Sequence, residues 1–188
     1  MPSEDCPYAG RGGLKLRHAL SHFGIDVSKC VAADLGSHVG GFVDCLLQTG
    51  AARVYSVDTS YGTLAWELRN DSRVVVMERQ NALHVELPEK VDLVTIDAGW
   101  TRQTAILPRA LSLVKEDGKV LSLLKPQYES TEDERVKGIV KPECVNAVVE
   151  RTLSELEGLG IVPADTVESP IVAEDARTNR EFFLLLNT

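Results

Sequence analysis

Short apolar runs alternate with amphipathic segments along most of the chain. The runs are dominated by Val, Ile and Leu, a composition typical of strands buried on both faces of a parallel sheet. Their length of six to eight residues also favours strands over helices. The predicted strands cover residues 30–35, 53–58, 73–79, 91–97 and 118–125.

Between these runs, apolar residues recur at helical spacing, as Leu16, Ala19, Leu20 and Phe23 do. Predicted helices cover residues 14–23, 40–48, 63–69, 104–114 and 142–159, and the polar stretch 126–141 is expected to be a loop. Two further β segments, 161–170 and 179–187, are expected to form a hairpin-like pair. Alternating strands and helices predict a doubly wound α/β fold, as a single domain over residues 1–188.

Composition supports a packed globular protein. Hydrophobic residues make up 44% of the 188, and no run reaches the roughly 18 apolar residues that a membrane helix needs. The amino terminus lacks the charged start and apolar stretch of a signal peptide, so we expect a cytoplasmic protein without membrane contact. The four cysteines form no C-x-x-C pair, so we expect reduced, mostly buried thiols and no zinc site.

A net charge of −8 argues against a protein that binds nucleic acid with its whole surface. This net charge does not exclude local basic patches. The stretch GRGGLKL at residues 10–16 leads into a predicted helix, and Arg11, Lys15 and Arg17 cluster there. Basic residues in such a pattern are usually solvated surface, and alone they are weak evidence of a binding site.

The loop DLGSHVGGF, residues 34–42, follows the first predicted strand, where ligands bind in this class of fold. Gly36 suits a tight turn, and we expect Gly40 and Gly41 to let a ligand approach the backbone. A dinucleotide-binding loop would read G-x-G-x-x-G, whereas here Asp34 precedes the first glycine. A carboxylate there repels pyrophosphate but favours an ammonium group.

Asp58 ends the second predicted strand and is placed to accept hydrogen bonds from ribose hydroxyls. S-adenosylmethionine, an adenosine that carries an amino acid through sulfur, has both an ammonium group for the loop at Asp34 and ribose hydroxyls for Asp58. A plain turn, or a dinucleotide site, remains the alternative for this loop.

Seven separated blocks resemble a known family. RGGLKL, DLGSHVGGF, ARVYSVDTSYGTLAW, RQNA, VTIDAGW, LLKPQYE and NREFF occur in order between Tyr8 and Leu186. Together they resemble the FtsJ-like ribosomal RNA 2′-O-methyltransferases, in the hemolysin-A-like (TlyA) branch. The resemblance implies a Rossmann-like methyltransferase that uses S-adenosylmethionine, with a seven-stranded, mostly parallel sheet and an antiparallel last strand.

The resemblance also implies the site residues. The family's Lys-Asp-Lys-Glu catalytic set falls on Lys15, Asp97, Lys125 and Glu181. The expected cofactor contacts are Asp34, Gly36, Ser37, Gly40, Gly41, Phe42, Asp58, Asn81, Ala82 and Asp97. Arg11, Lys15 and Trp100 are the expected RNA contacts, with the glycines before Lys15 following the RNA backbone. No metal is implied, because no phosphate leaves.

The chemistry suits these residue types. A ribose hydroxyl is a poor nucleophile until its proton leaves, and we expect Lys125 to act as its base or to orient it. A second lysine and partial burial would lower the pKa of Lys125. Lys15 would tune Lys125 and hold a substrate phosphate, while Asp97 and Glu181 would fix the lysine geometry.

Two departures from the family keep other functions open. Ala98, Gly99 and Trp100 follow Asp97 where the branch usually has Ser-Phe, although Trp100 suits stacking on a flipped base. The branch also usually carries an S4-type RNA-binding domain, whereas here only ten residues, of which 1–9 are a short extension, precede RGGLKL. Because all four residues of the catalytic set are present, we still expect an enzyme that methylates ribosomal RNA, free or within ribosomal subunits. The alternatives are a cofactor-binding module without catalysis and a methyltransferase for a small molecule or protein.

Overall fold

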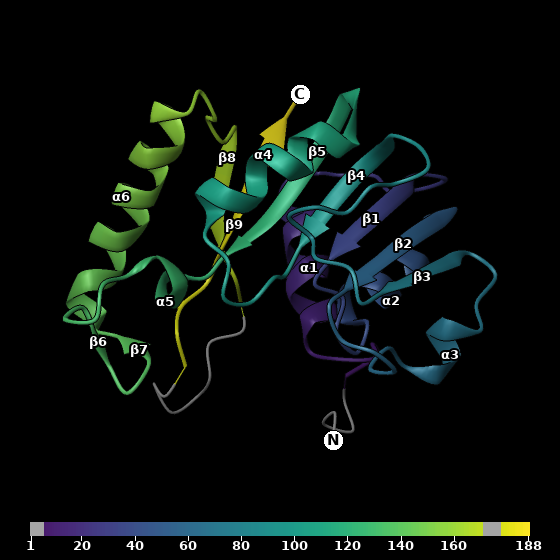
Figure 1. Cartoon of the computed structure of the whole chain (residues 1–188), viewed down its shortest axis with the longest axis horizontal. Coiled ribbons are helices and arrows are strands. Elements are labelled where there is room, and N and C mark those ends of the chain that lie inside the picture. The colour runs from purple at the N-terminus through teal and green to yellow at the C-terminus, as the bar shows by residue number, and fades with distance from the viewer. Residues whose placement is uncertain (1–5, 171–177) are drawn as a thin grey trace.

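A seven-stranded sheet with helices on both faces forms the protein (Figure 1). The computed structural model describes residues 6–170 and 178–188. The strands are β1 (Val31–Leu35), β2 (Arg53–Asp58), β3 (Val74–Glu78), β4 (Val91–Ile96), β5 (Val114–Leu124), β8 (Asp165–Glu168) and β9 (Phe182–Asn187). Their order in the sheet is β3-β2-β1-β4-β5-β9-β8. The first five are parallel, and β9 runs antiparallel between β5 and β8, as expected for the last strand.

The strand order reverses at β1. This strand pairs with β2 on one side and with β4 on the other, so Leu35 lies beside both Val57 and Ile96. In a doubly wound sheet, ligands bind beyond the carboxyl ends of the strands at this reversal. The loops that begin at Gly36 and Asp97 therefore border the position where a ligand is expected.

Apolar clusters cover both faces of the sheet, and neighbouring residues of one strand alternate between them. On β9, Phe182 and Leu184 join one cluster, while Phe183 and Leu185 join the other. This alternation explains why the strands read as continuous apolar runs, since both faces are buried.

The helices divide between these two clusters. Helices α1 (Gly12–His22) and α2 (Gly41–Gln48) pack on one face with α3 (Trp66–Arg69), and α4 (Gln103–Leu113) and α6 (Val145–Gly158) pack on the other. The short helix α5 (Pro126–Glu129) directly follows β5, and the 3₁₀ turn η1 (Pro142–Cys144) precedes α6. Figure 1 shows α4 in front of the sheet and α1 and α2 behind it.

The predicted strands and helices are present, with some differences in length. Helix α3 is shorter than predicted, β5 begins earlier, and the last long helix starts at Val145 after η1. The stretch 126–141, expected to be a loop, contains α5 and a small hairpin of β6 (Arg135–Val136) and β7 (Ile139–Val140). Of the cysteines, Cys45 is buried and the other described thiols are half-buried, so burial was overestimated.

Residues 1–5 of the predicted amino-terminal extension lie outside the described part of the chain. Within the described residues, no helix has the length and apolar character needed to span a membrane.

Candidate functional site

Two cavities lie at the carboxyl ends of the central strands, and they share Gly36, His38 and Asp97 in their walls. The larger has a volume of about 660 Å³ and the smaller about 310 Å³. Both volumes fall within the range typical of small-molecule sites. The cavities therefore form adjacent parts of one candidate site.

The fold brings nearly all the predicted site residues to these cavities. The larger one is lined by Arg11, Lys15, Asp34, Gly36, Ser37, Gly41, Phe42, Asp97, Lys125 and Glu181. The smaller one is lined by Asp58, Asn81, Ala82, Asp97 and Trp100. Gly40 lines neither cavity. The four residues of the predicted catalytic set thus share one cavity, although their positions in the sequence span most of the chain.

These four side chains form two lysine–carboxylate pairs. Lys15 on α1 lies 2.5 Å from Glu181, which immediately precedes β9. Lys125, which directly follows β5, lies 2.6 Å from Asp97, which directly follows β4. The four side chains are 13–24% exposed, so both pairs are shielded from water and remain accessible from the cavity.

The expected pKa shift of Lys125 is wrong in direction. Burial of the ammonium group, the largest influence, lowers its pKa, but the charge of Asp97 and its hydrogen bond to Lys125 outweigh burial. The pKa of Lys125 is therefore raised. Each lysine has its own carboxylate partner, so attraction dominates over the repulsion expected between two lysines.

Asp34 is fully buried, one residue before the end of β1. Its Oδ1 accepts a hydrogen bond from Thr95 at 2.7 Å, while its Oδ2 has no hydrogen-bond partner among the described residues. Burial raises the pKa of this carboxyl from its ordinary value of 3.8 to about 7. A buried acceptor without a partner in a cavity wall is suited to a cationic or hydrogen-bond-donating ligand group.

Asp58, in the smaller cavity, is held by backbone donors. The amide groups of His38 and Ser60 each donate to one of its carboxylate oxygens, at 2.7 Å. Burial would raise the pKa of Asp58, but these hydrogen bonds outweigh it and lower the pKa. Asp58 therefore stays ionised at neutral pH, with lone pairs left to accept hydrogen bonds from a diol.

The glycines near the site allow close contacts between neighbouring segments. Gly40 has a φ of +98°, and a Cβ there would lie 2.3 Å from Leu68. A Cβ on Gly41 would lie 3.0 Å from the Gly10 carbonyl oxygen, and one on Gly13 would lie 2.3 Å from the Tyr8 ring. The glycines before Lys15 thus bring the start of α1 against α2. Gly10 and Gly12 also line the larger cavity, and their expected place along an RNA backbone stays a prediction.

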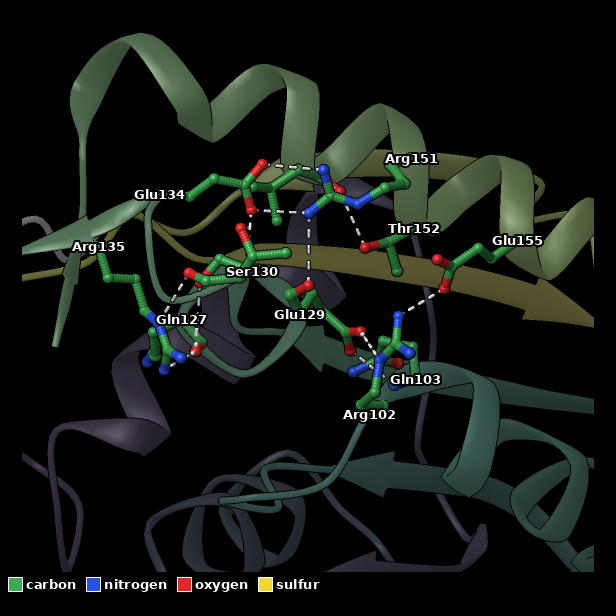
Figure 2. A network of polar contacts seen from close by, with 12 residues as sticks. Arg102, Gln103, Gln127, Glu129, Ser130, Glu134, Arg135, Arg151, Thr152 and Glu155 are labelled. Carbon is green, nitrogen blue, oxygen red and sulfur yellow. Dashed lines mark hydrogen bonds and ion pairs between the residues drawn. The ribbon is translucent and has the colours of Figure 1, made fainter.

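Sequence reasoning missed the residues that follow Lys125. Gln127 lines the larger cavity, and its buried Oε1 has no hydrogen-bond partner among the described residues. Glu129 accepts hydrogen bonds from the Arg102 side chain at 3.1 Å and from the Gln103 amide at 2.7 Å, which ties α5 to the start of α4 (Figure 2). The block LLKPQYE was the available signal, because these residues adjoin Lys125.

His38 and Asn179 also line the larger cavity and were not predicted. Across the described residues, no group of three or more His, Cys, Asp or Glu side chains is arranged to hold a metal ion.

Comparison with known proteins places the chain among methyltransferases. The model of the FtsJ-like methyltransferase family matches residues 8–188. YqxC of Bacillus subtilis, a candidate rRNA methyltransferase, is 40% identical over 96% of this chain and 66% of its own length. The 16S/23S rRNA (cytidine-2′-O)-methyltransferase TlyA of Mycobacterium tuberculosis is 36% identical over 96% of this chain and 69% of its own length. The chain thus spans about two thirds of the length of these relatives.

A solved structure shares the fold closely. A candidate hemolysin from Streptococcus thermophilus superposes with a TM-score of 0.90 at 32% identity, over 99% of this chain and 69% of that one.

Proposed function

The chain belongs to the FtsJ-like methyltransferase family, and we propose that it transfers a methyl group from S-adenosylmethionine to a ribose 2′-hydroxyl of ribosomal RNA. One observation carries the proposal: Lys15, Asp97, Lys125 and Glu181 line a single cavity. That cavity shares a wall with a second cavity suited to an adenosine. An rRNA substrate would place the activity in the cytoplasm.

The residues present fit the cofactor. Asp34 offers a buried oxygen without a partner, which suits the ammonium of an amino-acid group. Asp58 is ionised and lines the smaller cavity together with Asn81, which suits a ribose and a base. Asp97 lines both cavities and pairs with Lys125, so it would border the cofactor as well as the proposed base. S-adenosylmethionine, when bound, supplies an electrophilic methyl group on a sulfonium centre.

Lys125 is the proposed base or orienting group for the ribose hydroxyl, and Asp97 holds it by an ion pair at 2.6 Å. In this state the raised pKa keeps Lys125 protonated at neutral pH. Additional positive charge in the cavity would oppose the protonated form and lower that pKa. Lys15, held by Glu181, and the exposed Arg11 then supply cations for the substrate's phosphates.

The proposed function predicts that the protein methylates a ribose of rRNA when incubated with labelled S-adenosylmethionine. The measurement is methyl incorporation into naked rRNA and into intact ribosomal subunits, followed by mass mapping of nuclease fragments. A 2′-O-methyl group resists alkaline cleavage of the adjoining phosphodiester, so the product identifies the reacting atom. Tight cofactor binding without transfer to either substrate would favour a binding module instead. Transfer to protein or to small molecules alone would exclude the RNA assignment.

The raised pKa of Asp34 leads us to expect that cofactor binding depends on pH. Its pKa is raised by burial to about 7, and an ammonium ligand favours the ionised carboxylate. Affinity for S-adenosylhomocysteine should therefore rise about tenfold from about pH 6 to about pH 8, and Asp34→Asn should abolish this rise. Calorimetric titration at several pH values measures it. Asp58→Asn is the matched control, because the pKa of Asp58 is lowered: it should weaken binding but keep the pH dependence.

The raised pKa of Asp34 also affects the stability of the fold, which should fall as the pH rises, whereas cofactor affinity should increase. A carboxyl whose pKa rises on folding contributes stability at acidic pH that is lost as the pH rises through the folded-state pKa. The protein without ligand should therefore lose stability between about pH 4 and about pH 7, and Asp34→Asn should remove that loss.

A further inference from the structure

Lys125 follows the end of β5, where the pairing of the sheet stops. The last pair of β5 with β9 is Leu124 with Phe182, and its last pair with β4 is Ser122 with Ile96. Lys125 thus lies beyond the last pair of either ladder. It leads into α5, a helix of four residues, and so short a helix is not stable on its own. The direction of the lysine therefore depends on the contacts that anchor α5.

Glu129, the last residue of α5, supplies such an anchor. Its carboxylate accepts hydrogen bonds from the Gln103 amide at 2.7 Å and from the Arg102 guanidinium at 3.1 Å (Figure 2). Gln103 is the first residue of α4, so the carboxylate lies at the end of that helix where the dipole favours a negative charge. These two contacts with the start of α4 limit the rotation of α5 about the end of β5.

The start of α4 is itself held by the sheet. The Gln103 side chain accepts a hydrogen bond from the Ser122 hydroxyl at 2.6 Å and donates one to the Leu123 carbonyl oxygen at 3.4 Å. Both partners belong to the last turnless stretch of β5, just before Lys125. A closed path of contacts therefore runs from β5 to α4, through Glu129 to α5, and back to Lys125.

The burial of Glu129 is costly for a residue with only a packing role. Its side chain is 1% exposed, whereas Arg102 is 49% exposed and also pairs with Glu155 on α6 at 2.5 Å. Taking a carboxylate out of water is unfavourable, and apolar residues of similar volume often stabilise a protein as well as a buried ion pair does. The pair does provide directed contacts, which an apolar side chain at residue 129 would not.

The same two segments meet again at the reacting groups. Lys125 Nζ lies 2.6 Å from the Asp97 carboxylate and 3.4 Å from the Asp97 carbonyl oxygen. Asp97 is fixed in turn, because its amide donates a hydrogen bond to the Leu35 carbonyl oxygen on β1 at 3.0 Å. A small rotation of α5 would therefore move the lysine relative to a partner that stays in place.

We propose that Glu129 is a positioning residue for methyl transfer: it locks α5 against α4 and thereby sets Lys125 at Asp97 in the larger cavity. Glu129 lies outside the walls of both cavities, so it acts through Lys125 and not on a ligand. This inference rests on the proposed function, in which Lys125 meets the ribose hydroxyl.

The titration of Lys125 tests the positioning without a substrate. Its charged and titratable neighbours in the cavity and on α5 are Lys15, Asp97, Tyr128 and Glu181. Asp97 raises the pKa of Lys125 most. Glu129→Gln should loosen the contact between Lys125 and Asp97, so the pKa of Lys125 should fall. Heteronuclear NMR of isotope-labelled lysine measures this pKa, with the resonance assigned by its loss in Lys125→Arg.

A double variant separates positioning from a direct charge effect. If Glu129 acts by holding Lys125 at Asp97, then Glu129→Gln should leave the pKa of Lys125 unchanged once Asp97→Asn has removed that partner. An equal fall of the pKa in both backgrounds would mean that Glu129 acts on Lys125 by its charge alone, and would overturn the positioning role.

Methyl transfer supplies the second readout. Glu129→Gln should lower the single-turnover rate by about 10- to 50-fold, because a small misplacement of a reacting group slows the chemical step, while affinities for rRNA and S-adenosylhomocysteine stay unchanged. Glu129→Ala also removes the acceptor for the Gln103 amide and should lower the rate further. If Glu129→Ala does not fold, Glu129→Gln still carries the test, since it keeps the shape of the side chain. A fall in rRNA affinity that accounts for the whole effect of Glu129→Gln would overturn the inference.

Glu155→Gln is the matched control. Glu155 pairs with the same Arg102 guanidinium but belongs to α6 and is 38% exposed, so its loss should leave the titration of Lys125 and the transfer rate unchanged. Equal losses in Glu155→Gln and Glu129→Gln would assign the effect to the charge around Arg102 and would overturn the role of Glu129.

The two readouts also separate this inference from the proposed function. If the parent methylates rRNA and Glu129→Gln matches its rate, the positioning role fails and the proposed function stands. If the parent transfers no methyl group, the proposed function fails, and the titration of the single and double variants still decides whether Glu129 sets Lys125 at Asp97.

Discussion

Lys125→Ala is expected to lower the single-turnover rate of methyl transfer by ~10²–10⁴-fold, the scale of a positioned acid–base group, while S-adenosylhomocysteine affinity changes little. Lys125 is 14% exposed and lines the larger cavity but not the smaller one, where Asp58 and Asn81 lie. Its removal should therefore affect the reacting hydroxyl more than the cofactor. Labelled methyl transfer and calorimetry, performed on the same variant, separate the two effects.

Lys125→Arg should not restore the rate, because a guanidinium keeps its proton and cannot accept another. Lys119→Ala is the matched control: this lysine lies on β5, the strand that Lys125 follows, but its ammonium donates a hydrogen bond to the Asn187 side chain and lies outside both cavities. Transfer by Lys125→Arg at the parent rate would remove Lys125 from the role of base. A comparable loss in Lys119→Ala would indicate a general effect on the strand.

The sequence could predict the sheet because its signal is local. Each central strand is buried on both faces, so its apolar residues appear as a continuous run, as in Val91–Ile96. Asp97 and Lys125 could be placed together for the same reason, since each follows the carboxyl end of a parallel strand. The fold class and most of the site residues follow from these two signals and from the family blocks.

The stretch 126–141 could not be predicted in this way. Its polar composition suggests a loop, but its hairpin is held by side chains from distant parts of the chain. Arg151 on α6 pairs with Glu134 at 2.8 Å, and the Asn179 side chain accepts a hydrogen bond from the Val140 amide at 2.8 Å (Figure 2 shows the first pair). Neither partner is visible in a local pattern of residues.

The charge balance of the lysines was also beyond the sequence. Residue types alone suggested two lysines that repel each other, which would lower the pKa of Lys125. The structure pairs each lysine with its own carboxylate, Lys15 with Glu181 and Lys125 with Asp97. Whether the pKa rises or falls depends on these contacts, which are set by side-chain positions and not by spacing along the chain.

Asp97→Asn is expected to lower the pKa of Lys125 and the maximal rate of methyl transfer. Asp97 raises the pKa of Lys125 by its charge and by its hydrogen bond, whereas burial lowers it. The amide removes the charge but keeps the shape, so burial then has weaker opposition and the pKa should fall. If Lys125 acts as the base, the rate of the parent should increase with pH into the alkaline range, and the variant should reach its plateau at lower pH.

The plateau itself should fall by about 10²-fold, because the carboxylate that holds the Lys125 nitrogen in position, at 2.6 Å, is replaced by a neutral amide. Single-turnover rates from about pH 6 to about pH 10 measure both effects. Glu181→Gln is the matched control, since Glu181 pairs with Lys15 and raises the pKa of Lys125 less than Asp97 does. It should move the rise in rate in the same direction by a smaller amount. A rise in rate that stays at the same pH in Asp97→Asn would mean that another group loses the proton, and Lys125 would then act through its position alone.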